Sequence, residues 1–371
     1  MNADADPGSG LPPSGTTVVS LDSPSPSRGA TSAPAPGAAD EGRTTTSPMG
    51  PGSRLWATSL ERAALPLVLL LLVVIFSVLR PTSFATTDNA AAILGAQAVL
   101  VVVALGLLVP LRCGDFDLSV GGTLTLATMI VAVLNGQHGL PLWLSILAAL
   151  AAGAAVGAIN GFFVIVFGIN SFIVTIGIGT FLLGVVSWLS DNRIVSGIDS
   201  ALLDLVVLTR VLGIPLAFYY ALALCLLMWF VFERTATGRR WLFVGAGRDV
   251  ARLSGIKVDR NRWGALITSG AVAALAGVLY AGTTGSADPR GGVAYLLPAF
   301  AAAFLGATSI QPGQFNPFGT LVAAYFLLVG ITGLQMLGAE PYVQDLFYGG
   351  ALVLAVALSQ LLRGRRPQEL G

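Results

Sequence analysis

Long apolar segments follow one another along most of the chain, separated by short polar stretches. Most have close to the ~20 residues that an α-helix needs to cross the hydrocarbon core of a bilayer. The predicted spans, about ten in number, are 64–79, 91–111, 117–134, 142–167, 171–190, 212–232, 264–283, 292–310, 316–338 and 342–362. Lipid cannot bond a free N–H or C=O, and these runs are too continuously apolar for alternating barrel strands. The pattern therefore predicts an all-α, polytopic integral membrane protein.

Proline and glycine interrupt the apolar pattern most strongly between residues 292 and 338. The interrupting residues are Pro298, Gly306, Pro312, Gly313, Pro317 and Gly319. Because proline removes a backbone donor and glycine weakens a helix, we expect some helices to be broken or re-entrant in this region.

The N-terminal residues differ in kind from the rest of the chain. They are rich in Ser, Pro, Gly, Thr and Ala, so they bury too little apolar surface to offset the entropy of ordering. We therefore divide the chain into a disordered tail over 1–60, a membrane domain over 61–362 and a C-terminal tail over 363–371. A signal peptide is not expected, since the first apolar stretch begins only near Leu65.

Composition and charge agree with a membrane protein and suggest its orientation. The chain is 54% hydrophobic and only 11% charged, and its net charge of +1 gives no sign of a nucleic-acid partner. Basic residues near spans favour the cytoplasmic side. With both termini and the central loop 233–263 inside, only Arg80, Arg193, Arg210 and Arg290 of the 20 basic residues fall outside.

The chain has little of the chemistry that an enzyme or a metal site requires. Two cysteines, Cys113 and Cys225, form no CxxC motif, and the single His138 lies in a short polar loop. The only lysine, Lys257, stands between Ile256 and Val258, so a nucleotide-binding GK[ST] motif is absent. We predict no catalytic residue, no metal site and no cofactor bound by this chain.

The central loop 233–263 contains a short amphipathic pattern. Val250, Leu253 and Ile256 recur at every third position, and Arg248 and Arg252 lie four apart on another face. Asp249 suits the start of a helix of about two turns, and Gly255 suits its end. Such a short helix needs a surface to lie against, which is either the lipid headgroups or a cytoplasmic partner protein.

Polar residues within or beside the spans are candidates for a solute pathway. They are Asp115, Asp117, Ser119, Asn160, Asn170, Ser171 and Thr175. Acidic residues at membrane depth usually face protein or water, and the glycines around Asp115–Ser119 permit a helix break that lines a cavity. The alternative is local: the two aspartates cap a helix, Asn160 bonds a neighbouring helix, and Asn170, Ser171 and Thr175 bond the backbone at a turn.

Several motifs in this order resemble the permease subunits of bacterial ABC importers for ribose, xylose, galactose and related sugars. Gly114–Gly121 is similar to that family's GGIDLSVG segment, and 157–161 with 171–177 to its GxxNG and PFIVTLG segments. The stretch 237–258, with 306–309 and 319–321, completes a resemblance that covers residues 60–362. The chain departs from the family where Asp115 replaces a frequent glycine, where Asn170 and Ser171 replace a Pro-Pro pair, and where Ala307 and Pro312 loosen the C-terminal glycine pattern.

The resemblance implies a function and a set of partners. A membrane-spanning permease subunit would pair with a second copy or a related permease in the bacterial cell membrane and form the pore for a sugar-like solute. A cytoplasmic ATPase subunit would use the ATP, and an extracytoplasmic binding protein would deliver the solute. The implied contacts with the ATPase are Gly245, Arg248, Val250, Ala251, Arg252, Leu253, Gly255 and Ile256. The alternatives are an ion-coupled secondary transporter of a polar metabolite, an ABC permease for a nucleoside or autoinducer, and a membrane scaffold.

Overall fold

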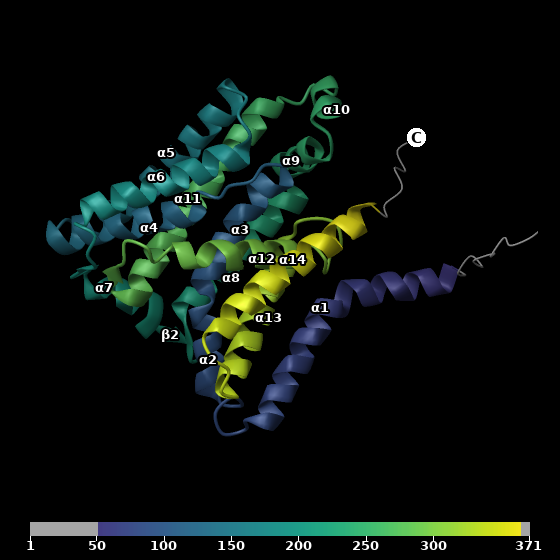
Figure 1. The fold of residues 1–371 in the computed structure, drawn as a ribbon, viewed down its shortest axis with the longest axis horizontal. Helices are drawn as coiled ribbons and strands as arrows, with labels where there is room; N and C mark the ends of the chain where they lie inside the picture. The colour runs from purple at the N-terminus through teal and green to yellow at the C-terminus, as the bar shows by residue number, and fades with distance from the viewer. Residues whose placement is uncertain (1–50, 365–371) are drawn as a thin grey trace, which may run out of the picture. The chain divides into compact units, whose positions relative to one another are not determined.

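The computed structural model describes residues 51–364, with side chains over 62–358, and these residues are almost entirely helical (Figure 1). The first half contains α1 (Pro51–Leu79), α2 (Thr87–Ala96), α3 (Ala98–Arg112), α4 (Val120–Val131) with its π-helical extension (Ala132–Gln137), α5 (Leu142–Val166), α6 (Ser171–Leu189) and α7 (Ser200–Leu203) with a π-helical turn (Asp204–Leu208). The second half contains α8 (Leu216–Arg234), α9 (Ala236–Ala246), α10 (Arg248–Leu253), α11 (Val258–Thr284), a 3-10 turn (Val293–Tyr295), α12 (Leu296–Gly306), α13 (Pro317–Met336) and α14 (Tyr342–Gly364).

Two small antiparallel pairs of strands lie in the connections between helices. β1 (Val195–Ser196) pairs with β4 (Ser286–Ala287), and β2 (Arg210–Val211) pairs with β3 (Ile214–Pro215). The first pair joins segments far apart in the sequence. It therefore ties the connection after α6 to the connection after α11.

The helices match the predicted spans, with shifted edges. Within residues 51–364, eight helices are long and apolar enough to cross a membrane, and shorter apolar helices cover Val293–Gly306 and Tyr342–Leu358. Together they account for the ten segments, and the all-α prediction is confirmed. Helix α1 begins at Pro51, so residues 51–60, which we assigned to the tail, are helical, as a proline at the first helical position permits. The rest of the predicted N-terminal tail and residues 365–371 lie outside the described part.

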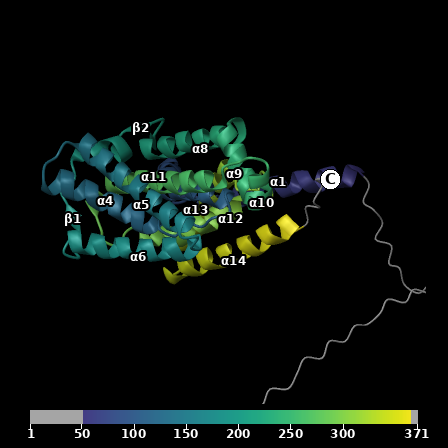
Figure 2. The same ribbon diagram turned by 90° about the horizontal axis from the view of Figure 1, so that it is seen from above.

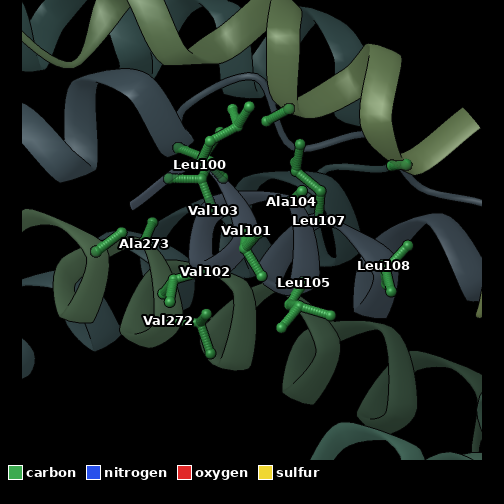
Figure 3. Packing of buried hydrophobic residues seen from close by; sticks show 14 of the residues in the cluster. Leu100, Val101, Val102, Val103, Ala104, Leu105, Leu107, Leu108, Val272 and Ala273 are labelled. Atoms are coloured by element: carbon green, nitrogen blue, oxygen red, sulfur yellow. The ribbon is translucent and has the colours of Figure 1, made fainter. Parts of the chain in front are cut away.

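Helix α3 is the centre of the molecule, and every one of its residues is buried. Its side chains pack on α11, as Figure 3 shows for Val272 and Ala273, and on α8 and α12. A helix that is apolar all round is expected to be surrounded by protein. Helices α5, α6 and α8 instead leave large apolar side chains exposed, as lipid-facing helices do.

Glycines allow α5 and α11 to approach each other closely, and both views show the two helices side by side (Figure 2). Gly153, Gly157 and Gly161 lie on one face of α5, and a Cβ at Gly157 would collide with the carbonyl oxygen of Leu266. From the other side, a Cβ at Gly270 would collide with the carbonyl oxygen of Gly153. Small residues at four-residue spacing thus create a helix contact that lipid alone would not drive.

The expected broken helix lies in the chain between α11 and α13. Helix α12 has 11 residues, about 16 Å at 1.5 Å per residue, which is too short to cross a bilayer core. Before it, an irregular segment runs against α4, where the N–H of Gly292 donates to Oγ1 of Thr125 at 3.1 Å. After it, Asn316 caps α13 and its amide donates to the carbonyl oxygens of Gly306 and Ser309. Protein groups therefore satisfy the backbone at both ends of this short helix, as a membrane requires.

We expect Gly157→Val to lower the melting temperature of the detergent-purified protein by several degrees. The added side chain overlaps the backbone of α11, and overpacking of this kind costs about 1–3 kcal/mol. Gly184→Val on α6 is the control, because a Cβ there has no neighbour within 4 Å. Equal melting temperatures for the two variants would contradict the close α5–α11 contact.

Candidate functional site

The chain between α3 and α4 carries two buried aspartates, Asp115 and Asp117. Gly114, with φ +77°, turns the chain out of α3, and residues 115–118 then run without helical structure to the start of α4. Side chains alternate along such a segment, so its residues reach two different surroundings. Asp117 and Ser119 enter the protein core, whereas Phe116 and Leu118 border a cavity.

Asp115 forms ion pairs with two arginines from the central loop and the helix that follows it. Arg262 of α11 donates from Nε and Nη2 to the two carboxylate oxygens, both at 2.7 Å. Arg248, the first residue of α10, donates from Nη2 to Oδ1 and to the carbonyl oxygen of Gly114, both at 3.0 Å. The bidentate pair fixes the direction of the carboxylate, and its side chain is almost fully buried. Asp115 therefore joins the predicted pathway segment to the predicted coupling loop.

Asp117 belongs to a separate polar cluster inside the protein. Its Oδ1 accepts from the N–H of Ser119 at 3.0 Å and from the Ser119 hydroxyl at 2.6 Å. The amide of Asn160 on α5 donates to Oγ of Ser119 at 2.8 Å. All three side chains are fully buried. These bonds match the local alternative, in which Asp117 holds the entry of α4 and Asn160 links α4 to α5.

The polar residues at the start of α6 also bond the backbone. Oδ1 of Asn170 accepts from the N–H of Phe172 at 2.8 Å and caps the helix. Oγ of Ser171 accepts from the N–H of Phe116 at 3.1 Å, and Oγ1 of Thr175 accepts from the N–H of Leu118 at 3.0 Å. Ser171 and Thr175 thus hold the irregular segment in place and leave its apolar side chains to face the cavity.

Aromatic rings surround the cavity beside this segment, and the sequence analysis did not identify them. The cavity has a volume of about 510 Å³. Its aromatic lining is Phe116, Phe172, Phe300, Phe304 and Phe315. The ring of Phe116 lies 6.3–6.5 Å from the rings of Phe172, Phe300 and Phe304. The signal was present in the sequence, because Phe116 alternates with the aspartates that we had singled out.

The central loop forms two short helices, and α10 confirms the predicted helix of about two turns. Ala251 is buried, whereas Val250 and Leu253 are 66% and 89% exposed. Gly255, with φ +80°, ends the turn after α10. Ile256 packs against the core and does not continue the exposed apolar face. The N–H of Ile256 donates to the carbonyl oxygen of Ala251, and this bond turns the chain back toward the protein. Residues 258–263, which we assigned to the loop, belong to α11.

The remaining predicted contacts of this loop have different surroundings. Gly245 packs against the carbonyl oxygen of Arg112 at the end of α3. Arg252 is exposed, and its Nη2 lies 3.6 Å from Oδ1 of Asp259. Beside α10 there is a cleft of about 700 Å³ whose lining includes Arg240, Lys257 and Arg260. The loop thus presents two exposed apolar side chains next to a basic cleft.

Within the described residues, no group of three or more His, Cys, Asp or Glu side chains is placed to hold a metal ion. Cys113 and Cys225 are both buried and free. Cys113 ends α3 and Cys225 lies in α8.

Comparison with known proteins identifies similar membrane permeases. The family described as "Branched-chain amino acid transport system / permease component" matches residues 89–356. The D-allose transport system permease protein AlsC of Escherichia coli is 31% identical over 295 residues, covering 80% of this chain and 90% of that protein. The ribose import permease protein RbsC of Escherichia coli is 32% identical, covering 78% and 91%. The autoinducer 2 import system permease protein LsrD of Salmonella typhimurium is 32% identical, covering 69% and 78%. No solved structure gives a significant match.

We expect Arg262→Gln to destabilise the protein clearly more than Arg260→Gln does. Removing one partner of a buried ion pair costs up to about 3–5 kcal/mol, and here Arg248 remains to reduce that cost. Arg260 is exposed and provides the control for loss of a positive charge on the same helix. Thermal melting in detergent measures both variants, and similar melting temperatures would show that the Asp115 pair contributes little to stability.

Proposed function

Because the chain belongs to the family of transport-system permease components that matches residues 89–356, we propose that it is the pore-forming subunit of an ABC importer for a sugar or sugar-like solute. It is a multi-pass membrane permease and not an enzyme. The family description refers to branched-chain amino acids, whereas the similar proteins are named for D-allose, ribose and autoinducer 2. The sugar-like class is supported by these relatives, which are similar over most of their length.

The proposed pathway passes the aromatic cavity beside Phe116. Four of the seven pathway residues inferred from the sequence are fully buried, so their proposed role is to support the wall of the pathway: Asp117, Ser119, Asn160 and Thr175. The proposed wall itself consists of Phe116, Leu118 and the phenylalanines of α12. An apolar constriction of this kind can close by excluding water, and the one acidic group in its lining, Asp115, is paired with two arginines.

One observation carries the proposed coupling mechanism: Arg248 of α10 bonds the carboxylate of Asp115, the residue directly before Phe116. In this proposal an ATPase subunit docks on Val250, Leu253 and the basic cleft. A displacement of α10 then moves Arg248, and Arg248 moves the 114–116 backbone through its bonds to Gly114 and Asp115. Phe116 follows, because it is the next residue along the chain. A rigid, two-partner ion pair transmits such a movement without any covalent step in this chain.

The proposed partners follow from this arrangement. ATP would bind and be hydrolysed on the separate ATPase subunit at the cytoplasmic side, and an extracytoplasmic binding protein would deliver the solute to the opposite face. A second copy of the permease, or a related one, would complete the pore in the bacterial cell membrane. An ion-coupled transporter would need an acidic group near the middle of a span to bind the coupling ion. Asp115 is poorly suited to bind such an ion, because it is already paired with two arginines.

We expect Leu253→Asp to abolish coupling while the permease still inserts into the membrane. The substitution places a carboxylate against an apolar partner surface, which typically costs a few kcal/mol at the centre of an interface. Co-purification of the ATPase subunit and solute-stimulated ATP hydrolysis in proteoliposomes should both fall at least tenfold. Leu212→Asp is the matched control, because Leu212 is 91% exposed in the β2–β3 turn.

Full stimulation of ATP hydrolysis by the Leu253→Asp variant would remove α10 from the coupling mechanism. Uptake of solute by the permease in the absence of any ATPase subunit would instead favour the secondary transporter. These two results are distinguishable, since the first requires the complete complex and the second requires the permease alone.

The proposed orientation predicts opposite labelling of two exposed serines. Both wild-type cysteines are fully buried, so single substitutions can be labelled against a silent background. A membrane-impermeant thiol reagent added to intact cells should label Ser200→Cys and not Ser254→Cys. Labelling of the Ser254→Cys variant alone would reverse the orientation and overturn the assignment of α10 to the cytoplasmic side.

A further inference from the structure

A smaller cavity lies beside the first turn of α12, and five of the nine residues that line it are polar. It has a volume of about 260 Å³. Its polar side chains are Gln97, Tyr280, Tyr295, Gln344 and Tyr348, from the α2–α3 break, α11, the 3-10 turn and α14. Liquid water occupies about 30 Å³ per molecule, so the cavity has room for about eight waters or one small solute.

The tyrosines of this cavity differ from the other tyrosines of the chain. Tyr219, Tyr220 and Tyr325 each donate their hydroxyl to a backbone carbonyl oxygen, and Tyr342 is largely exposed. The three remaining tyrosines are those that line the cavity, and within the described residues their hydroxyls form no hydrogen bond with the protein. None of the three is among the enclosed, unpaired polar atoms of the described residues, so each hydroxyl remains accessible. Three hydroxyls around one cavity are therefore available to a polar ligand.

Gln97 provides a hydrogen-bond acceptor, its amide oxygen Oε1, in the same cavity. It is 95% buried, and its Nε2 donates to the carbonyl oxygen of Ala324 at 3.0 Å. This bond fixes the amide, while Oε1 accepts no hydrogen bond from the described residues. A buried amide oxygen held in one direction is suited to accept from a ligand hydroxyl. The cavity thus offers both donors and acceptors at positions set by the fold.

The lining also limits the charge of a ligand. Every polar side chain around this cavity is a phenol or a carboxamide, and the lining contains no arginine, lysine, aspartate or glutamate. An amino acid would bring an ammonium and a carboxylate that the lining could not pair, and unpaired charges are costly away from water. The rings of Tyr280 and Tyr295 lie 5.6 Å apart in an edge-to-face contact and provide apolar surface as well. A neutral solute with several hydroxyls and C–H faces fits both properties.

We propose that this cavity, which we name the tyrosine cavity, binds the neutral, hydroxylated solute during its passage through the permease. The proposal rests on the proposed function and deepens it by assigning residues that choose the solute class. With the central loop on the cytoplasmic side, the tyrosine cavity lies toward the external side, because Tyr280 is close to the far end of α11. The solute then meets the hydroxyls first and the phenylalanine constriction second, along the short helix α12.

The first test compares Tyr280→Phe/Tyr348→Phe with Tyr342→Phe in the complete complex of permease, ATPase subunit and binding protein. Proteoliposomes are supplied with radiolabelled D-allose and D-ribose. The double variant should raise KM for uptake about tenfold, as the loss of two neutral hydrogen bonds predicts, while the melting temperature stays unchanged. Tyr342→Phe, on the same helix but outside the cavity, should behave as wild type. An unchanged KM in the double variant overturns the proposal.

The second test measures occupancy directly. An impermeant thiol reagent should label Tyr348→Cys from outside, millimolar D-allose or D-ribose should slow that labelling, and L-leucine should not. Tyr342→Cys is the control that neither sugar protects. Equal labelling rates with and without sugar, or protection by L-leucine, overturn the proposed site.

The two levels of the proposal fail in different ways. If the wild-type complex takes up neither sugar in an ATP-dependent manner, the sugar-importer function fails and the tyrosine cavity proposal fails with it. If wild-type uptake is ATP-dependent but the tyrosine variants show no effect, only the cavity assignment is overturned.

Discussion

The ion pair between Asp115 and its two arginines is the interaction on which the functional part of the structure depends. A carboxylate this deeply buried is tolerable only because Arg248 and Arg262 bond both of its oxygens. In doing so it holds the end of α3, the start of α10 and the first turns of α11 together. The irregular segment 115–118 can then remain extended beside the aromatic cavity. Among the described residues, the bonds of Arg248 to Asp115 and to the carbonyl oxygen of Gly114 are what link the exposed helix α10 to the wall of that cavity.

A second constraint comes from the membrane, where every backbone polar group needs a partner. The segment 115–118 leaves the helical pattern, and side chains from α6 replace the missing bonds: Ser171 and Thr175 accept from the N–H groups of Phe116 and Leu118. The short helix α12 is held in the same way by Thr125 before it and Asn316 after it. These polar side chains therefore form hydrogen bonds with backbone groups that lack a helical partner. The side chains left to face the cavities are phenylalanines along α12 and, beside its first turn, tyrosines with glutamines.

Much of the architecture was readable from the sequence because membrane spans obey a simple rule. A run of apolar residues of sufficient length must be helical in lipid, so the ten segments were predictable from hydropathy, and the prolines and glycines of 292–338 marked the broken region. The glycines of α5 also recur at four-residue spacing, a pattern that favours a close helix contact. The short helix of the central loop was also predictable from its amphipathic pattern and from Gly255. The inward turn of Ile256 was not predictable, because it depends on the hydrogen bond from its N–H to the carbonyl oxygen of Ala251.

The roles of individual polar residues were decided only by the tertiary structure. The sequence by itself determined that Asp115, Asp117, Ser119, Ser171 and Thr175 lie near span ends and that Asn160 lies inside a span, and it left both lining and local bonding open. Partners distant in sequence made the choice: Asp115 meets an arginine 147 positions away, and Asn160 meets Ser119 from another helix. The tyrosine cavity could not be predicted from the sequence, because Gln97, Tyr280 and Tyr348 come from different helices and share no local pattern. Periodicity along one helix reports which face is apolar, whereas a site built from several helices exists only once they are packed together.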